Sequence, residues 1–223
     1  MFWNREEDCF GFMQNCSIIE RAEKEEGVTK RQVLRIVMSI FDPLGLLSVV
    51  VVLGKLLLRE LWQHKIGWDD SIPKSTQVAW KKWCLEVKMA GKIKTPRFYG
   101  LNALEDVELH IFTDSSDKAF AAVAYFTFVI NGSCKSILVG SKTRVAPLKT
   151  LSIPRLELQA AVLGSRLSVS VEESHSIRIN RKFFWTDSQD VLYWVKSNNR
   201  RYRQFVEFRV GEITEKTNKC DWR

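Results

Sequence analysis

The second half of the chain alternates between apolar and polar positions, a pattern typical of β-strands. Four stretches predict strands: 107–113, 119–130, 134–143 and 177–185. Asn131-Gly132, between the second and third stretches, is a strong signal for a hairpin turn. Three stretches have helical spacing: 154–170, 188–196 and 204–215. Residues 220–223 have the pattern of the beginning of a further strand. The order predicts an antiparallel meander followed by βα units, and therefore an α/β fold.

The first half predicts helices instead. Thr29 is a suitable N-cap for a helix with apolar positions up to Phe41, which the turn sequence Asp42-Pro43-Leu44-Gly45 ends. Two more helices are expected over 48–62 and 73–91. Residues 1–15 alternate as in a hairpin, and 94–102 resemble a linker. We therefore expect three parts: 1–26 with a hairpin and an acidic linker, a helical unit over 27–102, and an α/β unit over 103–223.

The composition excludes several classes of protein. Hydrophobic residues make up 45% and charged residues 27% of the 223 positions, which suits a folded chain with a sizeable core. The longest apolar stretch, Leu44 to Leu53, is too short to cross a bilayer, so no membrane association is expected. Five cysteines without a Cys-x-x-Cys pair predict neither a disulfide framework nor a zinc site. A reducing, intracellular environment fits best.

The net charge of +8 is unevenly placed. Residues 1–26 hold three basic and seven acidic side chains, a balance of −4, so the rest of the chain carries +12. Such a surplus favours a polyanionic partner, since basic side chains release counterions when they neutralise phosphates. Ordinary solubility is the competing explanation.

Three carboxylates are candidates for a metal site. Asp114 ends the first strand of the second half, Glu157 lies one turn into the first long helix, and Asp187 ends the fourth strand. If these two strands are neighbours, both aspartates project at one edge of the sheet, and the helix brings Glu157 over them. Such a cluster of repelling groups suits two divalent ions, and oxygen ligands favour Mg²⁺ or Mn²⁺.

Each of these acids also has a simpler interpretation. Asp187 or Ser188 could cap the following helix, and Asp114 could belong to a turn. Glu157 could be an exposed helical residue paired with Arg155 or Arg166. The metal site is favoured because all three acids occur in the right order on the right elements.

The acidic motifs resemble those of type 1 ribonuclease H. The matching segments are Thr113-Asp114-Ser115-Ser116, the helix with Glu157, and Thr186-Asp187-Ser188-Gln189. Upstream, three segments resemble the Pao (Bel/Pao) class of LTR retrotransposon polyproteins: Thr29 to Leu34, Phe41 to Leu46, and Lys55 to Leu58. The resemblance covers nearly the whole chain. It implies a ribonuclease H-like mixed five-stranded sheet with flanking helices, preceded by a small helical thumb or connection unit.

The resemblance also implies a function. It predicts hydrolysis of the RNA strand in RNA–DNA hybrids, with Asp114, Glu157 and Asp187 as catalytic ligands of two Mg²⁺ ions. The expected partners are nucleic acid and an upstream reverse transcriptase segment, with residues 1–15 as the last hairpin of its palm. The expected location is the cytoplasm, a virus-like particle or the nucleus. Candidate nucleic-acid contacts are Ser115, Ser188, Gln189, Lys142, Arg144, Arg200, Arg201 and Arg203. Tyr202 could stack on a sugar or base.

Two departures from the family pattern shape these expectations. No Tyr-x-Asp-Asp polymerase motif occurs, so no polymerisation is expected. The family uses a fourth acidic ligand after the last strand, while this sequence ends at Arg223 and Asp221 is poorly placed to replace that ligand. Weaker binding of the second metal ion is the expected result. The alternatives are an inactive nucleic-acid-binding remnant, a co-opted module, or a fragment without a stable fold.

Overall fold

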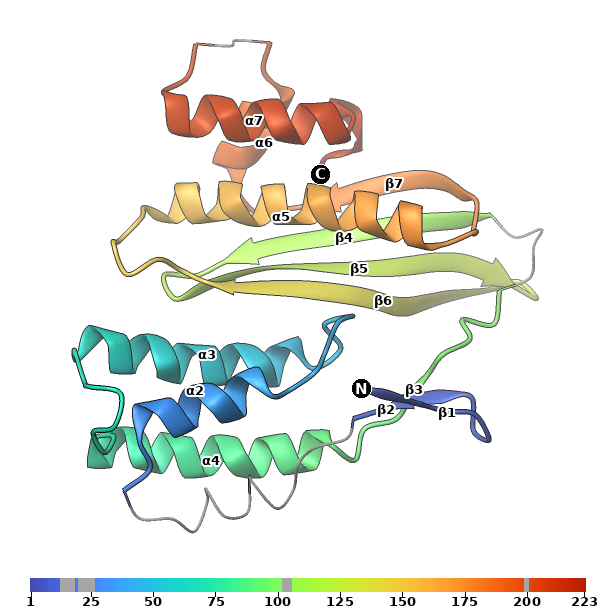
Figure 1. The fold of residues 1–223 in the computed structure, drawn as a ribbon. Helices are drawn as coiled ribbons and strands as arrows, with labels where there is room; N and C mark the ends of the chain where they lie inside the picture. The colour runs from blue at the N-terminus through green and yellow to red at the C-terminus, as the bar shows by residue number, and fades with distance from the viewer. Residues whose placement is uncertain (13–18, 20–26, 102–105, 199–200) are drawn as a thin grey trace. The chain divides into compact units, whose positions relative to one another are not determined.

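The computed structural model describes residues 1–12, 19, 27–101, 106–198 and 201–223. The chain divides into two compact units, Met1–Gly100 and Leu101–Arg223 (Figure 1). None of the described helices is long and apolar enough to cross a membrane. The acidic linker expected before Gly27 lies almost entirely outside the described residues.

Three helices make up most of the first unit: α2 (Lys30–Met38), α3 (Ser48–Gln63) and α4 (Lys74–Ala90). Thr29 caps α2 through a complete capping box with Gln32, as the N-cap position predicted. The buried rings of Trp80 and Trp83 stack with centroids 5.0 Å apart and anchor α4 in the core. Helical spacing in the sequence therefore located all three helices.

A small sheet completes the first unit. Strands β1 (Phe2–Asn4) and β2 (Cys9–Gly11) form the expected antiparallel hairpin. The sequence pattern missed β3 (Thr95–Pro96), which pairs with β2 although it lies within the expected linker 94–102. Only two residues pair there, too few for alternation to be recognised.

The second unit contains a mixed sheet of four long strands: β4 (Val107–Ser115), β5 (Ala119–Ile130), β6 (Ser133–Val145) and β7 (Ile179–Trp185). Their spatial order is β6-β5-β4-β7. The first three strands form an antiparallel meander, whereas β7 pairs with β4 in parallel. Asn131 and Gly132 both have positive φ, 50° and 76°, which is the conformation that a tight hairpin turn requires.

Helix α5 (Ile153–Ser174) packs on one face of this sheet, and α6 (Gln189–Lys196) and α7 (Gln204–Lys216) lie on the same side (Figure 1). Leu109, Ile111 and Leu158 are fully buried in this layer. Gly164 lets α5 approach β4 closely, because a Cβ atom there would stand 2.5 Å from Cγ2 of Thr113. The absence of a side chain at this position sets the distance between helix and strand.

The expected fifth strand, 220–223, is reduced to a single residue. Residues Lys219–Asp221 form a short 3₁₀ helix, and Trp222 alone makes a parallel bridge with Phe184 of β7. The indole of Trp222 is fully buried, stacks on Phe184 with centroids 5.0 Å apart, and donates from Nε1 to Oγ1 of Thr217. Burying this one large side chain fixes the segment, so the five-stranded sheet is corrected to four strands and a bridge.

Candidate metal centre

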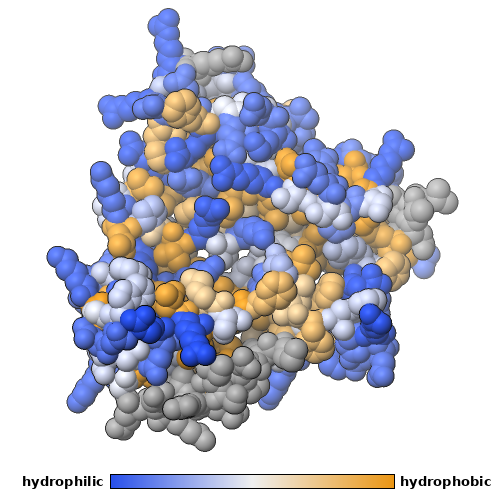
Figure 2. Space-filling model, in the orientation of Figure 1, coloured by the Kyte–Doolittle hydropathy of each residue, from blue (hydrophilic) through white to orange (hydrophobic). Residues whose placement is uncertain are grey.

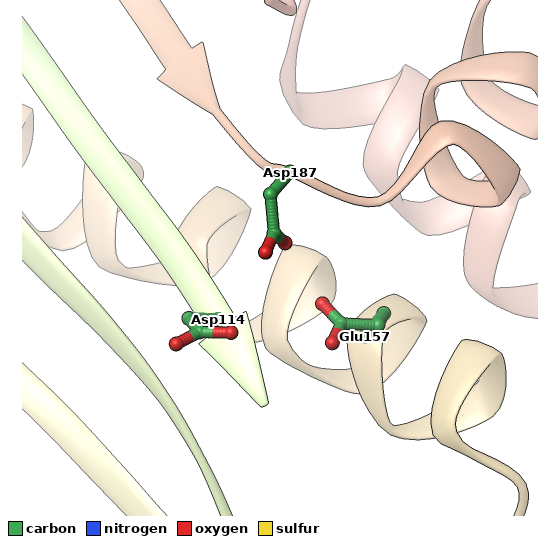
Figure 3. A group of neighbouring side chains, drawn as sticks. All are labelled: Asp114, Glu157 and Asp187. Carbon is green, nitrogen blue, oxygen red and sulfur yellow. The ribbon is translucent and has the colours of Figure 1, made fainter. Parts of the chain in front are cut away.

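Three carboxylates meet at one edge of the sheet in the second unit (Figure 3). Asp114 is the penultimate residue of β4, Asp187 follows two residues after the end of β7, and Glu157 lies on α5. Each offers an oxygen atom, and these atoms all lie within 4.8 Å of one another. The structure thus brings together the three acids that the sequence singled out.

The topology explains this convergence. β4 and β7 are parallel neighbours, so Asp114 and Asp187 leave the sheet at the same edge. Glu157 lies seven residues, two helical turns, before Gly164, and therefore faces the sheet as Gly164 does. The close approach of α5 at Gly164 brings the Glu157 carboxylate down to the level of the two aspartates.

Glu157 is the unusual member of the cluster. Only 7% of the residue is exposed, whereas Asp114 and Asp187 are exposed. Burial raises the pKa of Glu157, and the neighbouring Asp187 and Asp114 raise it further, while a hydrogen bond opposes them. In that bond Oγ of Ser115 donates to Oε1 at 2.8 Å. Oε2 is buried and has no hydrogen-bond partner among the described residues. A buried carboxylate oxygen without a donor is costly unless a cation or a proton satisfies it.

The simpler interpretations of these acids do not explain their positions. Ser188, not Asp187, caps α6 by accepting the Val191 N–H at 3.4 Å. Glu157 is not an exposed partner of a basic residue, because Arg166 binds Glu212 instead. Asp114 does accept a local bond from the Ser115 N–H at 2.6 Å, but one of its oxygens still faces the cluster.

The donor set fits a hard divalent cation. All three ligating groups are carboxylates, the preferred ligands of Mg²⁺ and Mn²⁺. The unpartnered Oε2 of Glu157 is the atom that a cation would satisfy. Three carboxylates at this separation repel one another, so a cation of charge +2 would stabilise the arrangement. The cluster could therefore hold a metal ion.

Two predicted phosphate contacts lie on the sheet near this edge. Lys142 and Arg144 are exposed on β6, opposite Ala122 and Phe120 of β5. Because Ala122 and Phe120 pair in turn with Thr113 and Ser115, the two basic residues lie level with the metal centre. Two strand spacings, about 10 Å, separate them from β4.

The other predicted contacts lie at the starts of α6 and α7. Gln189 is exposed at the start of α6, whereas the hydroxyl of Ser188 is occupied by capping. Arg201 and Arg203 are exposed just before α7, and Arg200 lies outside the described residues. Tyr202 is half-buried between them.

An apolar pocket that the sequence pattern did not reveal adjoins the two aspartates. Its volume is about 460 Å³. Phe112 and Trp185 form a wall, with stacked rings 5.9 Å apart. Each lies two residues before an acid of the cluster, on the face of the sheet opposite α5. An aromatic residue two positions before each aspartate, Phe112 before Asp114 and Trp185 before Asp187, is the sequence signal that could have located this pocket.

The meander, the helix that crosses it, the parallel fourth strand and the acidic cluster at the strand ends define a ribonuclease H-like α/β unit. Residues 29–188 match the family described as the Pao retrotransposon-like RNaseH-like domain. The chain belongs to this family.

The chain is also similar to solved structures, among them that of a viral polymerase protein. The solved structure of the foamy viral protease-reverse transcriptase dRH in complex with double-stranded DNA matches with a TM-score of 0.47 and 11% identity. The match covers 91% of this chain and 33% of that chain, so this chain spans about a third of that protein's length. No curated protein sequence matches the chain.

Proposed function

We propose that the second unit hydrolyses the RNA strand of RNA–DNA hybrids with two divalent metal ions, Mg²⁺ or Mn²⁺. The observation that carries this proposal is the buried Glu157 carboxylate, with an unpartnered oxygen, between two exposed aspartates. Membership of the Pao ribonuclease H-like family supports the same reaction.

The residues of the chain have separate tasks in this proposal. Asp114, Glu157 and Asp187 would hold the metal ions, and Ser115 would orient Glu157 through its hydrogen bond to Oε1. When bound, the ions would activate a water molecule and stabilise the charge on the leaving oxygen. Lys142, Arg144, Arg201 and Arg203 would approach backbone phosphates, and the helical part of the first unit, residues 27–102, would serve as thumb or connection.

The experiment is Mg²⁺-dependent cleavage of an end-labelled RNA–DNA hybrid by the full chain. Asp114→Asn should abolish cleavage, because it removes a charged ligand. Asp117→Asn is the matched control, since Asp117 is an exposed acid three residues further on and outside the cluster. Equal loss of activity in both variants, or full activity in Asp114→Asn, would contradict the assigned site.

A second candidate function is binding of nucleic acid without hydrolysis. Among the described residues only three carboxylates meet in the cluster, and Asp221 bonds with Asn218 instead of joining them. Wild-type protein that binds the hybrid in a salt-dependent manner but does not cleave it with Mg²⁺ or Mn²⁺ would support this candidate.

A further inference from the structure

A cluster of arginines lies between α5 and α7, apart from the metal centre. The guanidinium carbons of Arg155 and Arg209 lie 5.0 and 3.5 Å from the centroid of the Phe205 ring. Nearby, Arg166 crosses from α5 to α7 and donates two hydrogen bonds, 2.6 and 2.8 Å long, to the Glu212 carboxylate. Three positive groups therefore gather along one contact between two helices.

The carboxylate of Glu212 at this contact is already paired with basic side chains. Glu212 accepts both bonds from Arg166, and Lys216 lies 3.5 Å from one of its oxygens. These partners hold the pKa of Glu212 below its usual range. Within the described part of the chain, neither Arg155 nor Arg209 forms an ion pair. The cluster consequently has a surplus of positive charge.

Arg209 has an unsatisfied donor. Its Nη1 donates to the Phe205 carbonyl at 2.9 Å, but its Nε is buried and has no partner among the described residues. Burial lowers the pKa of Arg209, and the positive charges of Arg166 and Arg155 contribute. The hydroxyl of Tyr202, just before α7, is likewise buried without a described partner. Buried donors of this kind are costly unless an acceptor reaches them.

The position of the cluster relates it to the metal centre. Arg155 precedes Glu157 by two residues, so the two side chains leave α5 on nearly opposite sides. Arg166 lies about 16 Å further along the same helix. It also lines a pocket of about 230 Å³ together with Arg144 and Gln159. Hydrophilic side chains predominate around α7 in the view of Figure 2. Arg155 thus lies close to Glu157 along α5 but on the side of the helix that faces α7.

We propose that Arg155 and Arg209, held by Phe205, bind a backbone phosphate of the nucleic acid whose cleavage site lies at the metal centre. This inference rests on the proposed function. Two guanidinium groups offer planar donor forks that match phosphate oxygens, and neither of them is paired with a carboxylate in the described part of the chain. The aromatic ring keeps both cations in place before the ligand arrives.

The test measures binding of a short fluorescent RNA–DNA hybrid to the full chain without divalent metal, so that no cleavage occurs, over a range of NaCl concentrations. Arg155→Met and Arg209→Met retain an apolar stem against Phe205 and remove the charge. Each should weaken binding about 10-fold and reduce the slope of log affinity against log salt by about 0.9. Arg178→Met is the matched control, because Arg178 is exposed and lies just before β7, at the end of that strand opposite to Asp187.

Salt slopes in Arg155→Met and Arg209→Met equal to that of Arg178→Met would overturn the proposal. Thermal unfolding of each variant identifies any that fails to fold, and Arg155→Lys then gives a second test, since it keeps the charge but loses the fork. Titration with inorganic phosphate is a further arm. Stabilisation of the wild type by phosphate, without any change in hybrid binding in the variants, would mean a free-anion site and would also overturn the backbone assignment.

The two proposals fail separately. Wild-type protein that neither binds nor cleaves the hybrid contradicts the proposed function. Wild-type cleavage together with normal hybrid binding in both arginine variants contradicts only the phosphate site.

Discussion

Gly164 offers the sharpest test of how the fold builds the metal centre. In Gly164→Ala the new Cβ would lie 2.5 Å from Cγ2 of Thr113 and 3.1 Å from Cγ2 of Ile111. Carbon atoms prefer 3.5–4.0 Å, so α5 or Thr113 must move by about 1 Å. Rotating Thr113 would break the bond from its Oγ1 to the Trp185 carbonyl, 3.1 Å long. The helix therefore moves, and Glu157 moves with it.

The expected magnitude follows from two opposing effects. Overpacking of a tight core contact costs about 1–3 kcal/mol, while replacing glycine by alanine inside a helix gains about 1 kcal/mol. Gly211→Ala on α7 is the matched control, because nothing lies within 4 Å of its added Cβ. We expect Gly164→Ala to be less stable than Gly211→Ala by about 1–3 kcal/mol, measured by thermal unfolding.

The effect on function should exceed the effect on stability. Mg²⁺ requires ligands at 2.0–2.1 Å, and a displacement of about 1 Å in a catalytic group can lower the rate about 100-fold. The assays are Mg²⁺ titration followed by calorimetry, and cleavage of the hybrid. Gly54→Ala separates the two effects, since its Cβ would collide with the Trp83 ring at 2.6 Å in the first unit. It should destabilise that unit and leave Mg²⁺ affinity unchanged. If Gly164→Ala matches Gly211→Ala in stability, Mg²⁺ affinity and cleavage, the close approach at Gly164 does not set the position of Glu157.

Three further predictions concern the same unit. The raised pKa of Glu157 means that the folded, metal-free protein holds this proton more tightly than the unfolded chain, whose carboxyl has the ordinary value of 4.5. The free energy of unfolding should therefore fall as the pH rises from the ordinary value of 4.5 toward the raised pKa of Glu157 in the folded protein. Glu157→Gln should remove both this pH dependence and the stabilisation by Mg²⁺ in thermal unfolding. Ser115→Ala removes the bond that lowers the pKa of Glu157, so Mg²⁺ binding should shift to higher pH in titrations at several pH values; an unchanged pH profile would contradict this role. Trp222→Ala should lower the free energy of unfolding by about 3–5 kcal/mol in denaturant titrations, because a fully buried indole is lost. A loss no larger than that caused by substituting an exposed residue would refute the anchoring role of Trp222.

Much of the fold could be predicted from periodicity, because long elements repeat their pattern many times. The twelve residues of β5 alternate between buried and half-exposed positions almost without interruption. Thr29 and the Asn131-Gly132 turn were identified because their conformations demand particular residue types. The two-residue strand β3 and the bridge at Trp222 lacked such a signal, since one or two pairs show no period.

The candidate site was predictable in its members but not in its environment. The acids stood out through their positions at strand ends and one turn into a helix. The burial of Glu157 and the close approach at Gly164 depend on contacts between residues far apart in the sequence, which spacing along the chain does not encode. The pairing of Arg166 with Glu212 and the gathering of Arg155 and Arg209 around Phe205 likewise depend on how α7 packs against α5.

The three acids come from the ends of β4 and β7 and from α5, which packs on one face of the sheet, so no single helix or hairpin can assemble them. Bringing the three carboxylates together requires the parallel pairing of β7 with β4 and the packing of α5 on the sheet, both of which join distant parts of the sequence. If the cluster binds Mg²⁺ as proposed, affinity for Mg²⁺ would also report on folding. A partly folded chain that retains its helices and its hairpins but lacks this docking should have ordinary secondary structure by circular dichroism and no metal response.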